Sequence, residues 1–451
     1  MEILDLNNSL EKAKMSPVVR KLFFASMLIF IFNGYALINN TSINFIIAEW
    51  ALTPEFSGMV AVATIIGIIV GSIVFGTLTD KFENKYFTRK KVIIYCFILF
   101  SLFNGLCFFS KSVESFVGLR FIVGIGLGGV MPNILTLVSE YMPKYFKPTS
   151  MIILFSGCGI GGLLSEIISR NFIGQLGWEM MFLFSITPIL FIAMFINFIP
   201  ESINYLVRSK QREKAELILN NIGINRDVVS KSSLSKQNLA LEKTPFLALF
   251  RNKFKIVTLL FWLGSFLCIF MNFGLTSTLP KLLMLADYDV VHGLGYFIAL
   301  NLGGGIGSMF AGIMSERFRL DKLLYFMLCI GIAALYLMSM LYNHNPLLTY
   351  ACIVLGCAAS LGGQEIIVAL IGLSYDLKVR STALGYTLGI GHLGIFLGII
   401  LEPNALSSEL PLSFRFALLS IPCVLILICA FLMNLRKKSV AISTDYELIA
   451  K

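Results

Sequence analysis

Charged residues are scarce in this sequence, since Asp, Glu, Lys and Arg make up 14% of its 451 residues. A typical soluble domain carries about 25%. The shortage argues against a soluble enzyme, a disordered chain and a nucleic-acid-binding domain. Apolar residues fill 57% of the chain, and the mean hydropathy is +0.82. A transmembrane helix needs about 20 largely apolar residues, so the chain has room for about twelve such helices and one long loop.

Cysteine patterns typical of metal sites or disulfides are also missing. All nine cysteines fall inside apolar stretches, and no Cys-x-x-Cys pair occurs. A free cysteine in such surroundings is a small apolar filler. The run Gly124-x-Gly126-x-Gly128-Gly129 lacks the preceding strand of a dinucleotide-binding loop, and close helix packing explains it better. We therefore expect no metal and no cofactor.

Twelve apolar stretches are the predicted membrane helices. Their length, and the lack of alternation with a period of two, favour helices over a β-barrel. One stretch contains Glu365 and begins after the turn-forming sequence Asn343-His344-Asn345-Pro346. The stretches are 22–48, 56–79, 92–110, 121–139, 149–165, 180–200, 256–280, 293–315, 323–341, 347–374, 381–401 and 416–435.

The distribution of basic residues orients the predicted helices. Twelve spans place both termini on one side, and a cytoplasmic N-terminus puts all but five of the 36 Lys and Arg residues on the cytoplasmic side. Short cytoplasmic loops are rich in Lys and Arg. The same distribution explains the net charge of +10, so this charge does not indicate a nucleic-acid partner. The basic side would instead face anionic lipid.

A polar segment divides the spans into two groups of six. Its first part has helical spacing and mixed charge, so it is either a bridge with one or two amphipathic helices or a plain solvated tether. The predicted organisation is a cytoplasmic N-terminal segment 1–21, a six-helix bundle 22–200, a cytoplasmic linker 201–252, a second six-helix bundle 253–435 and a cytoplasmic tail 436–451.

An internal repeat supports this division. Two six-helix halves in one membrane chain are typical of secondary transporters, whose site lies between the halves near the midplane. Glycines four or five residues apart let a neighbouring helix approach closely, and the acid-base pair after each run is a candidate cytoplasmic gate. At a constant offset of 236 residues, Gly67, Gly71, Gly76, Asp80 and Lys81 recur as Gly303, Gly307, Gly312, Glu316 and Arg317.

Several motifs resemble those of the major facilitator superfamily. Gly76-Thr77-Leu78-Thr79-Asp80-Lys81 with Arg89-Lys90-Lys91 is similar to the signature loop, lengthened here by Glu83 to Thr88. The run from Arg120 to Gly129 is similar to the fourth-helix motif. Further matches resemble the aromatic acid:proton symporter branch and its organic-ion and sugar-transporting relatives: Met131-Pro132, Glu140-Tyr141-Met142-Pro143, Gly177-Trp178 and Pro200-Glu201-Ser202.

This resemblance implies a fold and a function. The fold would be two pseudo-symmetric bundles totalling twelve transmembrane helices. The function would be secondary active transport by alternating access, with proton-coupled uptake of a small organic anion such as an aromatic or heteroaromatic carboxylate. The protein would be a monomer in the inner membrane and not an enzyme.

Two positions depart from that branch. Asn33-Gly34-Tyr35-Ala36 stands where the branch has Asp-Gly-aromatic-Asp, whose carboxylates are linked to proton coupling. Gly391-His392-Leu393-Gly394 stands where it has Gly-Arg-x-Gly, whose arginine is a candidate partner for a substrate carboxylate. Either the substrate or the coupling therefore differs from that of the branch.

Polar residues inside the spans are the candidate site residues, because such groups are costly in hydrocarbon. Arg120 either binds backbone carbonyls or meets the substrate. Glu166 either pairs with Arg170 four residues later or carries a proton. Glu365 has no charged neighbour in the sequence and needs a partner, a proton or a cationic substrate. His392 is either a neutral core residue or a group that titrates near neutral pH.

The predicted residues form three sets. The predicted substrate-binding residues are Asn33, Tyr35, Arg120, Asn272, Gln364 and His392. The predicted proton-coupling residues are Glu166, Glu365 and His392. The predicted gating residues are Asp80, Arg89, Lys90, Glu140, Glu316, Arg317 and Arg380.

Three other functions remain open at this stage. A drug or metabolite exporter working by proton antiport is one, although the run Gly157-Cys158-Gly159-Ile160-Gly161-Gly162 lacks the proline frequent in such exporters. A transporter of an organic cation or zwitterion, balanced by Glu166 and Glu365, is the second. A transporter-like receptor that moves nothing is the third.

Overall fold

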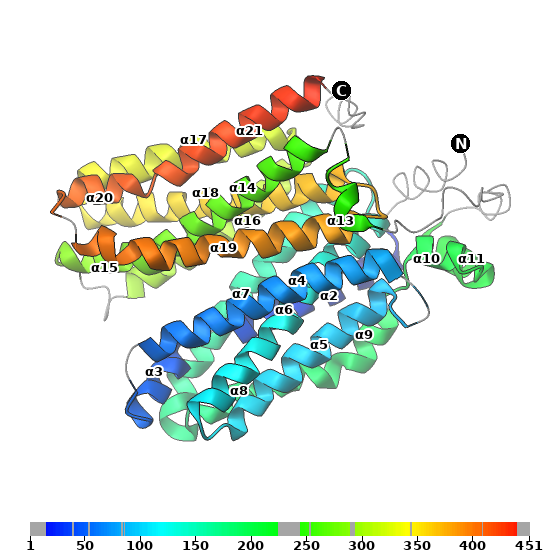
Figure 1. The fold of residues 1–451 in the computed structure, drawn as a ribbon, viewed down its shortest axis with the longest axis horizontal. Helices are drawn as coiled ribbons and strands as arrows, with labels where there is room; N and C mark the ends of the chain where they lie inside the picture. Colours follow the sequence, from blue (N-terminus) through cyan, green and yellow to red (C-terminus); the bar gives the residue numbers. More distant parts are fainter. Residues whose placement is uncertain are drawn as a thin grey trace. The chain divides into compact units, whose positions relative to one another are not determined.

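The computed structural model of the chain describes residues 15–37, 40–52, 55–82, 84, 86–223, 244–251, 254–288, 294–342, 345–407 and 409–439. All regular secondary structure within these ranges is helical (Figure 1). Eleven of these helices are long and apolar enough to cross a membrane, and the helix Ala299–Met314 is apolar but shorter. The predicted all-α polytopic class is confirmed, and each of the twelve predicted spans overlaps a described helix.

Two compact units are formed by the described residues. The first contains those up to Leu249 together with Tyr375–Gly389, and the second contains those of Phe250–Ser374 and from Ile390 onward. The sequence boundaries placed all of 253–435 in one bundle. The segment Tyr375–Gly389 lies with the first unit because its polar and small residues pack on helices of that unit, as described below.

The first unit is built from six spans and three short helices after them. The spans are α2 (Pro17–Leu37) with α3 (Asn40–Glu49), α4 (Glu55–Phe82), α5 (Arg89–Leu106) with η1 (Cys107–Phe109), α6 (Val113–Tyr141), α7 (Lys147–Leu176), and α8 (Glu179–Leu183) with η2 (Phe184–Phe191) and α9 (Ile192–Phe198). The short helices are α10 (Ile203–Arg208), α11 (Arg212–Ile222) and α13 (Pro245–Ala248).

The second unit contains the other spans. These are α14 (Lys255–Phe273) with η3 (Gly274–Thr278) and α15 (Leu279–Leu285), α16 (Leu294–Met314), α17 (Leu320–Leu341), α18 (Pro346–Ser374), α19 (Arg380–Ser407), and α20 (Leu412–Leu418) with α21 (Ile421–Ser439). The helix α19 contributes its residues up to Gly389 to the first unit and the following residues to the second.

The repeated glycines allow one close helix pair in each unit. A Cβ at Gly67 or Gly71 of α4 would collide with the backbone of α6 near Phe121 and Ile125. At the corresponding positions, Gly303 and Gly307 of α16 lie against the backbone of α18 at Val354 and Ala358. Such contact is how helices associate in lipid, where burial of apolar side chains supplies little driving force.

Two spans are less regular than the sequence predicts. The first span, predicted as 22–48, is described as α2 up to Leu37 and as α3 from Asn40. The sixth contains the 3₁₀ segment η2 around Pro188, because proline has no N–H to donate within a helix. The seventh passes through the π-helical turn η3 and continues to Leu285, beyond the predicted end at 280.

The predicted linker contains short helices within its described part. The buried face of α11 consists of Ala215, Leu219 and Ile222, and this helix packs against α2. This amphipathic helix fits the bridge alternative better than a plain tether. Most of the predicted N-terminal segment and tail lies outside the described residues, as does 224–243.

Candidate functional site

A buried arginine joins three helices of the first unit. The side chain of Arg120 on α6 is 3% exposed. It donates to the backbone carbonyl of Ala36 on α2 at 3.0 Å and to Asn104 Oδ1 on α5 at 2.7 Å. Its Nε has no hydrogen-bond partner, and no described carboxylate pairs with it. Arg120 is therefore a buried cation whose contacts are all neutral.

Asn33 and Tyr35 lie on α2, within one turn of the carbonyl that Arg120 binds. Asn33 is 1% exposed. Its Nδ2 donates to the carbonyl of Leu127 on α6 at 3.4 Å, while its Oδ1 is buried without a partner. The hydroxyl of Tyr35 donates to the carbonyl of Met181 at 3.0 Å. The structure thus brings Asn33 and Arg120 to one interface of α2 and α6.

In the second unit, a polar contact joins α14 to α18. Gln364 Nε2 donates to Ser265 Oγ at 3.2 Å, and the buried Gln364 Oε1 has no partner. Gly391 of α19 lies against Ser265, and the next residue, His392, is partly exposed. Asn272 lies two turns from Ser265 on α14, so the two share a helix face.

Glu365 occupies a different interface, between α18 and α16. It is 4% exposed, and its Oε1 lies 2.7 Å from Ser308 Oγ. Its Oε2 is buried without a hydrogen-bond partner. Among the described residues no cation pairs with this carboxyl group. Adjacent helix positions differ by about 100° in direction, which is why Gln364 and Glu365 contact different helices.

A compensated charge cluster lies at the ends of α4, α5 and α6. Arg89 pairs with Asp80 Oδ1 at 3.2 Å and with Glu140 Oε2 at 3.8 Å. Ser202 Oγ donates to Glu140 Oε1 at 3.1 Å, and the backbone N–H of Asn204 donates to the same oxygen at 2.9 Å. The structure brings these three predicted gating residues together, buried and with both carboxylates against one arginine.

The segment Tyr375–Gly389 packs on this cluster. Thr382 donates to Asp80 Oδ2 from its backbone N–H at 2.7 Å and from its hydroxyl at 2.9 Å. Arg89 also donates to the carbonyl of Leu377 at 2.8 Å, and Arg380 donates to Ser139 Oγ at 2.8 Å. Asp80 therefore neutralises the first turn of α19, where free N–H groups favour an anion.

Sequence reasoning missed Thr382, Leu377, Ser202 and Asn204. Three of these contribute backbone groups, which leave no trace in a sequence. Thr382 carries a weak signal, because a threonine in the first turn of a predicted helix has donors for an acidic side chain. Its acidic partner lies 302 positions away in the chain, so spacing alone does not connect the two.

Other predicted residues lie apart from these clusters. Lys90 donates to the carbonyl of Ile196 at 2.6 Å. Glu316 and Arg317 are exposed beyond the end of α16, so the repeat of Asp80 and Lys81 is not a structural repeat of the charge cluster. Glu166 is partly exposed on α7, and its pairing with Arg170 stays a prediction because that side chain lies outside the described residues.

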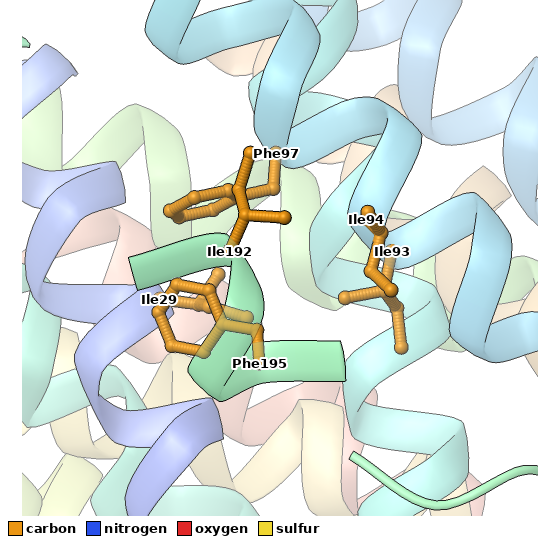
Figure 2. A pocket seen from close by; sticks show the side chains of 6 residues that line it. All are labelled: Ile29, Ile93, Ile94, Phe97, Ile192 and Phe195. Atoms are coloured by element: carbon orange, nitrogen blue, oxygen red, sulfur yellow. The ribbon is translucent and has the colours of Figure 1, made fainter. Parts of the chain in front are cut away.

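A pocket in the first unit is entirely apolar (Figure 2). It offers no hydrogen-bonding or charged group to a polar ligand, so we do not assign the site there. The described His, Cys, Asp and Glu residues also form no group of three or more that could hold a metal ion. The lining residues of the pocket are Ile29, Ile93, Ile94, Phe97, Ile192 and Phe195.

Comparisons with known proteins agree over most of the chain. A family model described as Major Facilitator Superfamily matches residues 22–399. The benzoate transport protein of Acinetobacter baylyi is 35% identical over 439 residues, covering 96% of this chain and 93% of that protein. The niacin transporter of the same organism is 29% identical over 77% of this chain and 78% of its own.

A solved structure resembles the fold as well. The proton:xylose symporter XylE, bound to 6-bromo-6-deoxy-D-glucose, has a TM-score of 0.69 to this chain at 16% identity. The match covers 91% of this chain and 94% of the other. At this identity the likeness concerns the fold alone.

Proposed function

The chain belongs to the Major Facilitator Superfamily, and from this premise we propose that it takes up a small aromatic carboxylate together with protons by alternating access. Membership makes the protein a multi-pass membrane transporter of small molecules and not an enzyme. The predicted family and fold class are confirmed. The substrate, the coupling, the inner-membrane location and the monomeric state are parts of the proposal.

Arg120 carries the proposal for an anionic substrate. A cation removed from water and lacking an anionic partner is costly. Among the residues that the structure describes, Arg120 meets only neutral acceptors, and its buried Nε meets none. A substrate carboxylate would supply the missing charge and form short, charge-assisted hydrogen bonds with the guanidinium group. Benzoate and niacin, named for the two relatives, are both ring carboxylates.

Neutral polar residues would hold the rest of the substrate. Asn33 Oδ1 and Gln364 Oε1 are each buried without a partner, so each amide keeps unused hydrogen-bonding capacity. We assign Asn33, Tyr35, Asn272, Gln364 and His392 to substituents or ring atoms of the substrate. Asn33 and His392 replace an acid and an arginine of the aromatic acid branch, which would make this site more neutral than that of the branch.

The charge cluster at Arg89 would act as the cytoplasmic gate. Asp80 and Glu140 hold Arg89, and Asp80 also holds Thr382 of α19. Because α19 continues into the second unit, releasing its first turn would free a helix that both units share. The cluster would form and break once in each transport cycle.

Substrate-dependent thermal stabilisation of the purified protein tests the proposed substrate class. A ligand that binds the folded state raises its melting temperature. We expect stabilisation by benzoate and nicotinate, and little by the corresponding neutral amides. Arg120→Lys keeps the charge but loses the planar fork, so it should weaken this stabilisation. Arg120→Gln should abolish it.

Arg415→Gln is the matched control for these variants. Arg415 also donates to backbone carbonyls, those of Leu406 and Leu410, but it lies on α20, near the C-terminal end of α19. Its substitution should leave carboxylate binding unchanged. Undiminished carboxylate binding by folded Arg120→Gln would contradict the assignment.

A cation or zwitterion is the second candidate substrate. The observation that favours it is Glu365, a buried carboxyl group with no described cationic partner. Stabilisation by amines and not by carboxylates would favour this candidate. If this candidate is correct, the affinity for the amine should also fall in the Glu365→Gln variant.

A further inference from the structure

We propose that Glu365 is the proton-binding group of this transporter, and that its proton forms a hydrogen bond that ties α18 to α16. The inference deepens the proposed function, because it rests on proton-coupled transport and names the group that carries the proton. It selects one of the three predicted titratable residues, from the hydrogen bonds around Ser308.

The hydrogens at Ser308 indicate the state of Glu365. Ser308 Oγ lies 2.9 Å from the carbonyl of Gly304 and 2.7 Å from Glu365 Oε1. A hydroxyl group carries one hydrogen and can accept with its lone pairs, whereas a carbonyl can only accept. Ser308 has one hydrogen for these two oxygens, so when it donates to Gly304, the hydrogen of the second bond comes from Glu365. The carboxyl group is protonated in this arrangement.

The opposite assignment is costly. If Ser308 donated to an ionised Glu365, the contact with Gly304 would contain no hydrogen. The carboxylate would then be buried with a single donor, its Oε2 unpartnered and no cation beside it. Burying an unpaired ion costs several kcal/mol after relaxation. The protonated form satisfies both contacts and leaves no buried charge.

No other charged group near this interface compensates Glu365. The helices α14, α16 and α17 pack against α18. Within the described part of the chain, none of their titratable residues forms a hydrogen bond or ion pair with it. These residues are Lys255 and Cys268 on α14, Tyr296 on α16, and Asp321, Lys322, Tyr325, Cys329 and Tyr336 on α17.

The position of Glu365 links the binding of its proton to the packing of α16 against α18. Ser308 and Glu365 lie beside the glycine contacts at which Gly303 and Gly307 of α16 meet α18. Loss of the proton would leave an anion between two helices that offer it one hydroxyl donor. The anion would need water or a cation, and either requires the helices to separate. Proton release would thus favour a looser arrangement of α16 and α18.

Infrared spectroscopy on vesicles detects this proton without any substrate. At neutral pH exposed carboxyl groups are ionised, so a protonated carboxyl band reports buried acids. We expect wild-type protein to show this band and Glu365→Gln to lose it. Glu409→Gln makes the same chemical change at an exposed position and should keep the band. An unchanged band in Glu365→Gln would overturn the proposal.

Transport by the same variants tests the coupling. In proteoliposomes a gradient of about one pH unit supports about tenfold accumulation for each proton carried. An amide at position 365 still donates to Ser308 but cannot release a proton. Glu365→Gln should therefore keep its melting temperature and substrate exchange but lose accumulation driven by the gradient, while Glu409→Gln behaves as wild type.

Three results would contradict the proposal, and a fourth would bear on the substrate alone. Accumulation retained in Glu365→Gln, or driven by sodium instead of protons, would overturn it. Loss of folding together with exchange in Glu365→Gln would assign the carboxyl group a structural role instead. If no aromatic carboxylate exchanged in the wild type, the substrate would be wrong, and the infrared test of Glu365 would still decide its protonation.

Discussion

At the scale of residues, the buried ionisable groups discussed above fall into two kinds. Arg89 is neutralised by Asp80 and Glu140. Arg120 and Glu365, in contrast, meet only neutral groups among the described residues. A neutralised cluster stabilises one arrangement, whereas an arginine without an anionic partner can still pair with a ligand, and a carboxyl group without a cationic partner is stabilised by a proton. This contrast is why we assign gating to the first kind and binding to the second.

Removing the charge of Asp80 tests the gating assignment. Asp80→Asn should keep an acceptor for Thr382 but weaken the pair with Arg89. We expect a loss of about 1–3 kcal/mol of stability, slower transport and nearly unchanged substrate affinity. Thermal unfolding, counterflow rates and ligand binding measure the three quantities.

Glu316→Gln is the control, because Glu316 occupies the repeat position of Asp80 but is exposed. Exposed substitutions usually change stability by less than about 0.5 kcal/mol. If Asp80→Asn lost affinity while its transport rate at saturation stayed normal, a gating role for Asp80 would be rejected.

Residue types were easier to predict from the sequence than residue partners. The polar groups inside apolar spans mark Arg120, Gln364 and Glu365 as candidates without any structure. Their partners include the carbonyl of Ala36 and the hydroxyl groups of Ser265 and Ser308. Carbonyls are present at every position, and a serine in an apolar span is common, so neither stands out in a sequence.

At the scale of elements, glycine spacing determines which helices pack most closely. The helix α4 meets α6 and α16 meets α18 through glycines related by the repeat. The repeat thus predicted the packing correctly. It did not extend to the charges that follow, because Asp80 contacts the first turn of α19, while Glu316 is exposed.

Two glycines of α4 provide a matched pair of variants. Gly71→Ala would place a methyl group against the backbone of Ile125, whereas Gly58→Ala would meet open space. Overpacking typically costs about 1–3 kcal/mol, so Gly71→Ala should lower the melting temperature and the folded yield. Gly58→Ala should change neither. Equal effects of the two substitutions would show that close approach at Gly71 does not limit stability.

The irregular elements were the least predictable part of the fold. Uncharged stretches locate spans but not the breaks inside them. The sequence contains Pro188, yet prolines within membrane helices are often accommodated, so the change to 3₁₀ geometry in η2 does not follow from its presence. The π-helical turn η3 is followed by Pro280 at the start of α15, and this proline likewise does not by itself predict the type of turn.

At the scale of the whole molecule, the basic residues predict the orientation in the membrane. Lys210 follows α10 in the linker, and Glu409 precedes α20. Both side chains are exposed. The positive-inside distribution puts the first in the cytoplasm and the second outside.

Single cysteines at these two positions test the orientation. In a background lacking the exposed Cys329, a membrane-impermeant thiol reagent added to intact cells should label Glu409→Cys. Lys210→Cys should react only after the membrane is opened. The reverse pattern would invert the proposed topology and, with it, the side assigned to the gate.

The most direct measurement for the whole account is uptake of radiolabelled benzoate into proteoliposomes with an alkaline interior. We expect accumulation above that in protein-free liposomes, which disappears when the pH gradient is collapsed. Arg120→Gln should bind and transport none. Glu365→Gln should exchange benzoate without accumulating it. Benzoate binding without exchange or accumulation in the wild type would contradict the account and favour a receptor.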